Sequence, residues 1–112
     1  MRIINHIKGM DEIHQILCKT AVIIFKNSPV CPVSRAARSE FEKFAEKSDD
    51  SVDLYMVDVI NSRNISNSIE KQTKIKHESP QVMLLKNNTV VWHASHGEIT
   101  AKKIEEVLNT YR

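Results

Sequence analysis

The sequence predicts an α/β fold in which helices cover both faces of a four-stranded mixed sheet. Apolar, β-branched segments alternate with amphipathic ones, and this alternation favours parallel pairing of the first two strands. The last two strands are separated only by Asn87-Asn88, which predicts an antiparallel hairpin because Asn tolerates positive φ. The 112 residues fit one compact domain, expected to span residues 1–112.

The first half of the chain predicts a helix, a buried strand and a long second helix. Residues 10–19 carry Ile and Leu at helical spacing, and residues 20–26, TAVIIFK, have the nearly continuous apolar character of a strand buried on both faces. The polar NSPV stretch then breaks the pattern. Residues 31–48 form one helical face, with Pro32 in the first turn and Cys31 as N-cap. The expected buried face is Val33, Ala36, Ala37, Phe41, Phe44 and Ala45.

The second half predicts three strands and two further helices. Gly97 marks a turn after the hairpin, and Thr100 is the expected cap of the last helix. The expected elements are a strand at 52–59, a weaker helix at 61–76, strands at 81–86 and 89–94, and a helix at 100–112.

Composition and charge exclude several classes of function. Sixteen basic and fourteen acidic residues are interspersed, whereas proteins that bind nucleic acid through its phosphates cluster Lys and Arg on one face. No window is apolar enough for a membrane span, and the first fifteen residues lack the core of a signal peptide. A cytoplasmic protein is therefore expected, and its cysteines are expected to be free thiols.

Cys31 is the strongest candidate for a reactive residue. It follows a buried strand and begins a helix, so it lies beyond the carboxyl end of the strand, where α/β proteins gather their functional groups. The unpaired N–H groups and the dipole of that helix favour a thiolate. Ser34, one turn further on, can donate its hydroxyl to the sulfur. The alternative is that Cys31 is a small buried residue beside a turn.

Cys18 is not expected to be a partner for Cys31. It precedes the strand that Cys31 follows, and seven strand residues separate their ends by roughly 20 Å. A disulfide needs Cα atoms within about 7 Å. Cys18 is instead expected to be buried in packing. A lone thiol at Cys31 can attack a mixed disulfide and take up the released group, but an external thiol must then free it.

Two stretches, SPVCPVSRAARSEFEKF and IKHESPQVMLLKNNTVVWHASHGEIT, resemble the monothiol bacilliredoxins, a family with a thioredoxin-like fold found in bacteria that use bacillithiol. The resemblance implies a thiol–disulfide oxidoreductase that removes bacillithiol from S-bacillithiolated cytosolic proteins, with Cys31 as nucleophile. It also implies no bound cofactor, with bacillithiol as the thiol co-substrate.

The resemblance further implies roles for five residues around Cys31. Pro32 and Ser34 would support the thiol, and Val30, Ser79 and Pro80 would bind substrate. In this fold the proline matching Pro80 is cis and lies against the active cysteine. The family usually has Thr where this chain has Val30, so a hydrogen bond to substrate is expected to be weakened, while the attack by Cys31 is not affected.

Other functions are weighed against this one. The alternative is a thioredoxin-like module that binds clients or senses oxidation without turnover. A cluster-binding monothiol glutaredoxin fits less well, because proline follows Cys31 and the chain has only two glycines. His77, His93 and His96 invite a metal site, yet none is predicted because four convergent ligands are lacking. Arg35 and Arg38 could meet the carboxylates of bacillithiol or be solvated helix charges.

Overall fold

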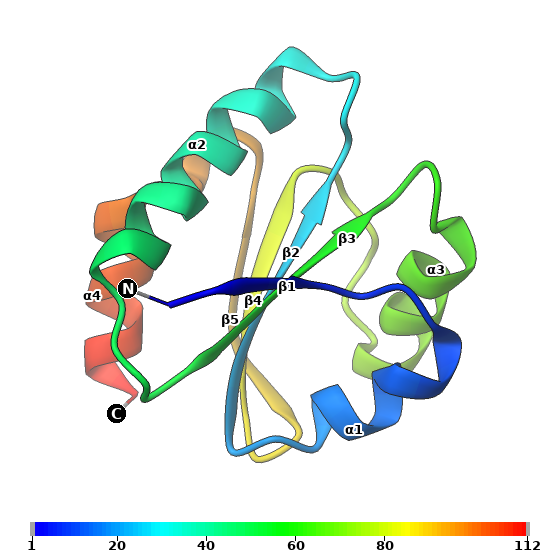
Figure 1. Ribbon diagram of the computed structural model, residues 1–112, viewed down its shortest axis with the longest axis horizontal. Coiled ribbons are helices and arrows are strands. Elements are labelled where there is room, and N and C mark those ends of the chain that lie inside the picture. Colours follow the sequence, from blue (N-terminus) through cyan, green and yellow to red (C-terminus); the bar gives the residue numbers. More distant parts are fainter. Residues whose placement is uncertain (1, 112) are drawn as a thin grey trace.

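The centre of the computed structural model, which describes residues 2–111, is a mixed sheet of five strands in the order β1-β3-β2-β4-β5 (Figure 1). The strands are β1 (Ile4–His6), β2 (Ala21–Asn27), β3 (Asp53–Asp58), β4 (Gln81–Lys86) and β5 (Thr89–Ser95). β3 is parallel to both of its neighbours, β1 and β2. β4 is antiparallel to β2 and to β5. The predicted parallel pair and the predicted hairpin are both confirmed.

Helices cover both faces of this sheet, as predicted, with α2 and α4 on one face and α1 and α3 on the other (Figure 1). The helices are η1 (Met10–Glu12), α1 (Ile13–Leu17), α2 (Pro32–Lys47), α3 (Arg63–Thr73), η2 (His96–Glu98) and α4 (Ala101–Thr110), of which η1 and η2 are 3₁₀ turns. Each face of the sheet contributes to its own apolar core.

Strand β2 lies at the middle of the molecule and is buried along its whole length. Its side chains alternate between the two cores, so that Phe25 faces α2 while Ile24 faces α3. The ring of Phe25 stacks on that of Phe41 in α2, with 5.1 Å between the centroids. This stacking attaches the long helix to the strand that precedes it, on the two sides of the corner that holds Cys31.

The fifth strand, β1, is absent from the four-stranded sheet that the sequence predicts. β1 has only three residues, Ile4–His6, and most of its surface is exposed at the sheet edge. Such a short edge strand carries no apolar alternation, so nothing in its sequence indicates pairing. Its backbone hydrogen bonds with β3 define it, and those depend on the rest of the fold.

Part of the predicted buried face of α2 is wrong. Val33 and Ala36 are exposed, whereas Ser34 is fully buried. The buried side chains of the helix are Ser34, Ala37, Phe41, Phe44 and Ala45. They form one stripe at offsets of three and four residues. The apolar residues Val33 and Ala36 lie beside that stripe, so the helix is rotated relative to the face that apolar residues alone suggest.

The predicted turns and caps mostly agree with the structure. Asn87 and Asn88 have φ of 51° and 66°, which is the left-handed pair that a tight hairpin turn needs. Thr100 caps α4, and its hydroxyl accepts from the amide of Lys103. The helix expected at 61–76 is shorter, because Lys74 adopts φ of 61° and ends α3.

None of the helices in the described part of the chain combines the length and the apolar character needed to cross a membrane.

Candidate functional site

Cys31 lies at the corner between β2 and α2, as predicted, and is the N-cap of α2. Its backbone is extended, with φ of −99° and ψ of 125°, and Pro32 supplies the first helical residue. The carbonyl of Cys31 accepts the first hydrogen bond of the helix, from the amide of Arg35 at 3.1 Å. The side chain is partly exposed and the thiol is free, so the sulfur is open to a reactant.

The first turn of α2 favours the charged form of this sulfur. The pKa of Cys31 is lowered first by hydrogen bonding from the Ser34 amide and next by the Val33 amide. Partial burial opposes this effect, and the Ser34 hydroxyl adds to it. Pro32 has no N–H to give, so the amides of Val33 and Ser34 are the first available donors of the helix. A thiolate at this position therefore meets unpaired donors at the positive end of a helix dipole.

Ser34 connects the loop before the cysteine to the helix after it. Its side chain is buried, and its Oγ accepts from the amide of Ser28 at 3.3 Å. Because that lone pair is engaged, the hydroxyl proton is free to point at the sulfur of Cys31, in agreement with its effect on the thiol pKa. Where a second thiol would stand in a dithiol site, this chain has a hydrogen-bond donor that is inert toward disulfides.

Exposed apolar residues flank Cys31 along the chain. Val30 is 73% exposed and Val33 is 47% exposed, and Pro32 between them is also exposed. Exposed apolar residues on both sides of a reactive group provide surface that a partner can cover. Val30 has no hydroxyl, so in this chain the position contributes apolar contact area.

The peptide bond between Ser79 and Pro80 is cis, which agrees with what the family resemblance implies. Lys26 of β2 pairs with Gln81 of β4, so Ser79 and Pro80 lie at the end of the sheet from which the chain runs to Cys31. Pro80 is buried, and its carbonyl accepts from the amide of His96 at 3.0 Å. The structure therefore brings the two sequence-predicted parts of the site to one end of the sheet.

One functional candidate at this end was not anticipated, namely the pair of Lys26 and His77. From the sequence, Lys26 is placed at the end of a strand and His77 is weighed only as a metal ligand. In the structure Lys26 is 0% exposed, and its Nζ lies 3.1 Å from Nδ1 of the partly buried His77. The available signal is a lysine within an otherwise apolar run, AVIIFK, which predicts a buried amine in need of a partner.

Cys18 is exposed, so the expectation that it is buried is wrong. It is the C-cap of the short helix α1, beyond the stripe of Ile13, Ile16 and Leu17 that packs inward. Its sulfur lies 3.7 Å from Nε2 of His14. Cys18 precedes β2 and Cys31 follows it, so the two free thiols lie at opposite ends of a buried strand.

The other predicted polar residues do not form a second site. Within residues 2–111, no three His, Cys, Asp or Glu side chains are grouped so that they could hold a metal ion.

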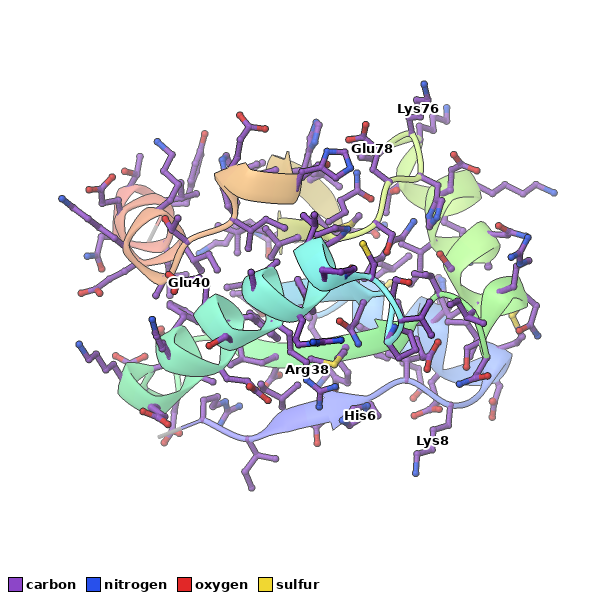
Figure 2. The ribbon with its side chains drawn as sticks, turned by 90° about the horizontal axis from the view of Figure 1, so that it is seen from above. His6, Lys8, Arg38, Glu40, Lys76 and Glu78 are labelled. Atoms are coloured by element: carbon purple, nitrogen blue, oxygen red, sulfur yellow. The ribbon has the colours of Figure 1, made fainter. Side chains whose placement is uncertain are left out.

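Two charged residues of α2 have partners within the protein. Arg38, labelled on α2 in Figure 2, pairs with Glu42 at 3.4 Å. Glu40 on the same helix points toward α4, where its carboxylate accepts from the Ala101 amide (Figure 2).

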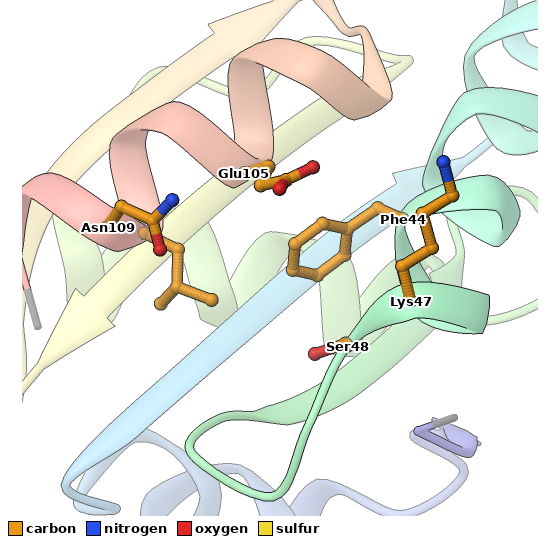
Figure 3. Close-up of a pocket in the computed structure, with 6 residues that line it drawn as sticks. Phe44, Lys47, Ser48, Glu105 and Asn109 are labelled. Atoms are coloured by element: carbon orange, nitrogen blue, oxygen red, sulfur yellow. The ribbon is translucent and has the colours of Figure 1, made fainter.

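A small pocket of about 60 Å³ lies between the far end of α2 and α4 (Figure 3). Phe44, Lys47 and Ser48 line it from the α2 side, and Glu105 and Asn109 line it from α4. Ser48 follows the last residue of α2, whereas Cys31 precedes the first, so the length of the helix separates this pocket from the thiol.

Comparison with solved structures identifies the fold of this chain. A structure whose description gives it a thioredoxin fold and a candidate oxidoreductase role is 31% identical, with a TM-score of 0.83, over 94% of this chain and 93% of that one. A thioredoxin from Malassezia sympodialis is 19% identical with a TM-score of 0.78, over 98% and 91% of the two chains. A mutant thioredoxin from Halobacterium salinarum is 14% identical with a TM-score of 0.75, over 96% and 89%.

These similarities show a thioredoxin fold with one extra short strand relative to the sheet that the sequence predicts. A protein-family model described as monothiol bacilliredoxin BrxC matches residues 3–104. That match covers both the cysteine corner and the Ser79-Pro80 segment. The chain therefore belongs to the monothiol bacilliredoxin family.

Proposed function

We propose that this protein is a thiol–disulfide oxidoreductase that removes bacillithiol from S-bacillithiolated cytosolic proteins, with Cys31 as its nucleophile. The observation that carries the proposal is a partly exposed thiol at a helix N-cap, its pKa lowered by the amides of Ser34 and Val33. Membership of the bacilliredoxin family supports the choice of bacillithiol as the group removed.

In the first step the Cys31 thiolate attacks the bacillithiol sulfur of the mixed disulfide on the client. A bond forms between the Cys31 sulfur and bacillithiol, and the client cysteine leaves as a thiolate that takes a proton from water. The number of disulfides is unchanged, so this step needs no oxidant. The helix amides that stabilise the attacking thiolate also favour its later departure as a leaving group.

The second step restores the free thiol. Cys18 is at the opposite end of β2 and cannot reach Cys31, so the resolving thiol comes from outside. The thiolate of a second bacillithiol attacks the bound bacillithiol sulfur, and Cys31 leaves as a thiolate. The product is bacillithiol disulfide: over the two steps one free bacillithiol thiol has been oxidised and one client cysteine has been reduced, so the number of disulfides is unchanged. Bacillithiol is thus a co-substrate, and no bound cofactor takes part.

Substrate binding is assigned to Val30, Ser79 and Pro80, with Pro32 and Ser34 supporting the thiol. Val30 offers exposed apolar surface beside the sulfur. The backbone of Ser79, at the same end of the sheet, can pair with an extended segment of the client in the manner of an added strand. Arg35, exposed in the first turns of α2, offers a guanidinium to the carboxylates of bacillithiol.

The test follows the bacillithiol adduct by mass spectrometry. A client protein carrying bacillithiol on one cysteine is mixed with the wild type, with Cys31→Ala and with Cys18→Ala. We expect the adduct to move to residue 31 in the wild type and in Cys18→Ala, and to stay on the client with Cys31→Ala. The function is disproved if Cys31→Ala strips the client as fast as the wild type.

The same experiment distinguishes the enzyme from a module that only binds clients. Such a module would leave the adduct on the client in every variant, even when it forms a stable complex. Addition of free bacillithiol completes the test, because an enzyme then releases more unmodified client than there is protein present.

A further inference from the structure

Lys26 is a buried charge on the side of the sheet that faces α3. It is the penultimate residue of β2, and none of its surface is exposed. Its neighbours on the same face, Val22 and Ile24, are part of the apolar core. Burial lowers the pKa of Lys26 to about 8, against the opposing influence of Glu70. An amine in this setting needs a specific partner, because an unpaired buried ammonium is very costly.

That partner is the imidazole of His77. Nζ of Lys26 lies 3.1 Å from Nδ1 of His77, and Oγ of Ser66 in α3 lies 3.2 Å from the same nitrogen. An ammonium can only donate, so Nδ1 accepts, and the single ring proton of His77 is then on Nε2. Ser66 is itself buried, so its hydroxyl lies beside this contact between α3 and the loop.

The backbone around His77 is held as firmly as its ring. The amide of His77 donates to Glu70 of α3 at 2.6 Å. One residue earlier, the carbonyl of Lys76 accepts from the side-chain amide of the buried Gln81 at 3.0 Å. The side chain of Lys76 points outward from this loop (Figure 2), whereas Glu78 is half-buried and its carboxylate is hydrogen-bonded to Ser95. The loop is therefore attached to the sheet and to α3 through its inward-facing groups.

This attachment lies just before the Ser79-Pro80 bond. Lys26 and Gln81 are partners in the pairing of β2 with β4, so the Lys26 side chain lies at the end of β4 that follows residues 76–79 and Pro80. Oγ of Ser79 is buried and has no hydrogen-bond partner among residues 2–111. The side chain of Ser79 thus does not hold it in place, and the contacts of its neighbours do, among them those of His77 two residues earlier.

We propose that Lys26 is a positioning residue for disulfide exchange at Cys31: by donating to Nδ1 of His77 it holds residues 76–79, so that the backbone of Ser79 is ready for substrate. The inference rests on the proposed function, and it adds a residue that acts from beneath the site without touching the reacting sulfurs.

The charges that face His77 agree with this arrangement. Burial lowers the pKa of His77 first, and Lys26 and Arg63 act in the same direction, while Glu70 and Glu78 oppose them. The ring is therefore neutral at pH 7 and Nδ1 is available to accept. Acidification below the usual range of histidine places a proton on Nδ1, facing the ammonium, so the contact is lost as the pH falls.

The kinetic test compares three variants with the wild type in bacillithiol transfer from a bacillithiolated client peptide. Lys26→Met removes the donor. His77→Asn keeps an acceptor near the position of Nδ1, whereas His77→Leu removes it. Loss of this charge-assisted hydrogen bond is expected to raise KM roughly fivefold or more in Lys26→Met and His77→Leu, with His77→Asn much closer to the wild type. The alkylation rate of Cys31 is expected to stay within about twofold of the wild type.

Two outcomes of the kinetic test overturn the inference. One is an unchanged KM in Lys26→Met. The other is an equal loss in His77→Asn and His77→Leu, which indicates that bulk and not hydrogen bonding matters. If the wild type itself transfers no bacillithiol, the proposed function fails, and the kinetic role of Lys26 fails with it.

A second measurement needs neither activity nor a variant. Nitrogen NMR of the imidazole in the wild type at pH 7.5 is expected to show that Nδ1 of His77 is unprotonated and that Nε2 carries the proton. A protonated Nδ1 overturns the inference even if the variants do not fold.

A third measurement compares the wild type with Lys26→Met. Amide exchange of residues 76–79 is expected to be roughly tenfold faster in Lys26→Met, and equal exchange in the two proteins likewise overturns the inference.

Discussion

The amide of Ser28 donates to the buried Oγ of Ser34 across 3.3 Å, and this hydrogen bond joins the loop before Cys31 to the first turn of the helix after it. The cysteine is thus held between two segments that are bonded to each other. Its own amide donates to the carbonyl of Ser28 at 3.3 Å, which closes the turn. The direction of the Cα–Cβ bond of Cys31 is therefore set by backbone contacts on both sides of the residue.

Replacement of Ser34 by Ala is expected to slow alkylation of Cys31 at pH 6.5. The change removes the hydroxyl that assists the thiolate and leaves the Ser28 amide without its acceptor. One such hydrogen bond is equivalent to a roughly two- to tenfold change in rate. The measurement is iodoacetamide alkylation in a Cys18→Ala background. Ser39→Ala, at an exposed position of the same helix, is the matched control and should react like the parent.

The pH profile of alkylation should have its midpoint at a lower pH in the folded protein than in urea. The helix amides lower the pKa of Cys31 only when α2 is formed. The folded-state pKa is depressed, so the thiolate adds stability above the unfolded pKa, and that stability is lost as the pH falls through the folded pKa. Equal midpoints in buffer and in urea would show that the helix does not act on the sulfur.

Phe41→Ala is expected to lower the free energy of unfolding by about 3–5 kcal/mol, because it empties a fully buried site against Phe25. Val33→Ala, also on α2, should cost less than about 0.5 kcal/mol because Val33 is exposed. Urea denaturation of the two variants measures the difference. Comparable losses would mean that α2 is rotated from the orientation seen here.

The contrast between these two residues shows what the sequence could predict. Apolar spacing identified α2 and its N-cap, since strand, proline and helical period all indicate the same boundary. It misplaced Val33 because a small polar residue, Ser34, takes the buried position instead. Burial of a serine depends on a partner such as the Ser28 amide, and that partner is brought close only by the turn of the folded chain.

The same reasoning applies to the site as a whole. Cys31 and Ser79-Pro80 were recognisable because short local patterns and a family resemblance mark them. Lys26 and His77 are 51 positions apart, and their contact depends on the pairing of β2 with β4 and on the path of the loop after α3. Contacts of this kind arise from topology, so no window of the sequence contains them.

Cys18→Ser is expected to leave the free energy of unfolding within about 0.5 kcal/mol of the wild type, because Cys18 is exposed at the end of α1. Cys18 should also be alkylated in the native protein without denaturant. Mass spectrometry after brief alkylation of folded protein tests both thiols together. Protection of Cys18 until urea is added would restore the buried position that the sequence suggested.

Asp53→Asn is expected to destabilise the protein at pH 7 and much less at pH 2–3. Asp53, at the start of β3, pairs with Lys19 at 3.2 Å and also with Arg2. Burial alone would raise the pKa of this carboxyl, but the hydrogen bonds from Lys19 and Arg2 outweigh it and lower the pKa. The folded-state pKa is depressed, so the stabilisation is present above the unfolded value and is lost as the pH falls through the folded one.

The size of that effect is modest, because Asp53 keeps some contact with water and its partners are partly exposed. A loss of about 0.5–1 kcal/mol at pH 7 is expected from urea denaturation. Asp50→Asn is the matched control, since Asp50 also pairs with Arg2 but is almost fully exposed, and its loss should be near zero. Equal losses for the two variants at pH 7, or a loss for Asp53→Asn that persists at pH 2, would contradict the assignment. Either result would mean that the ion pairs of Asp53 with Arg2 and Lys19 do not stabilise the fold.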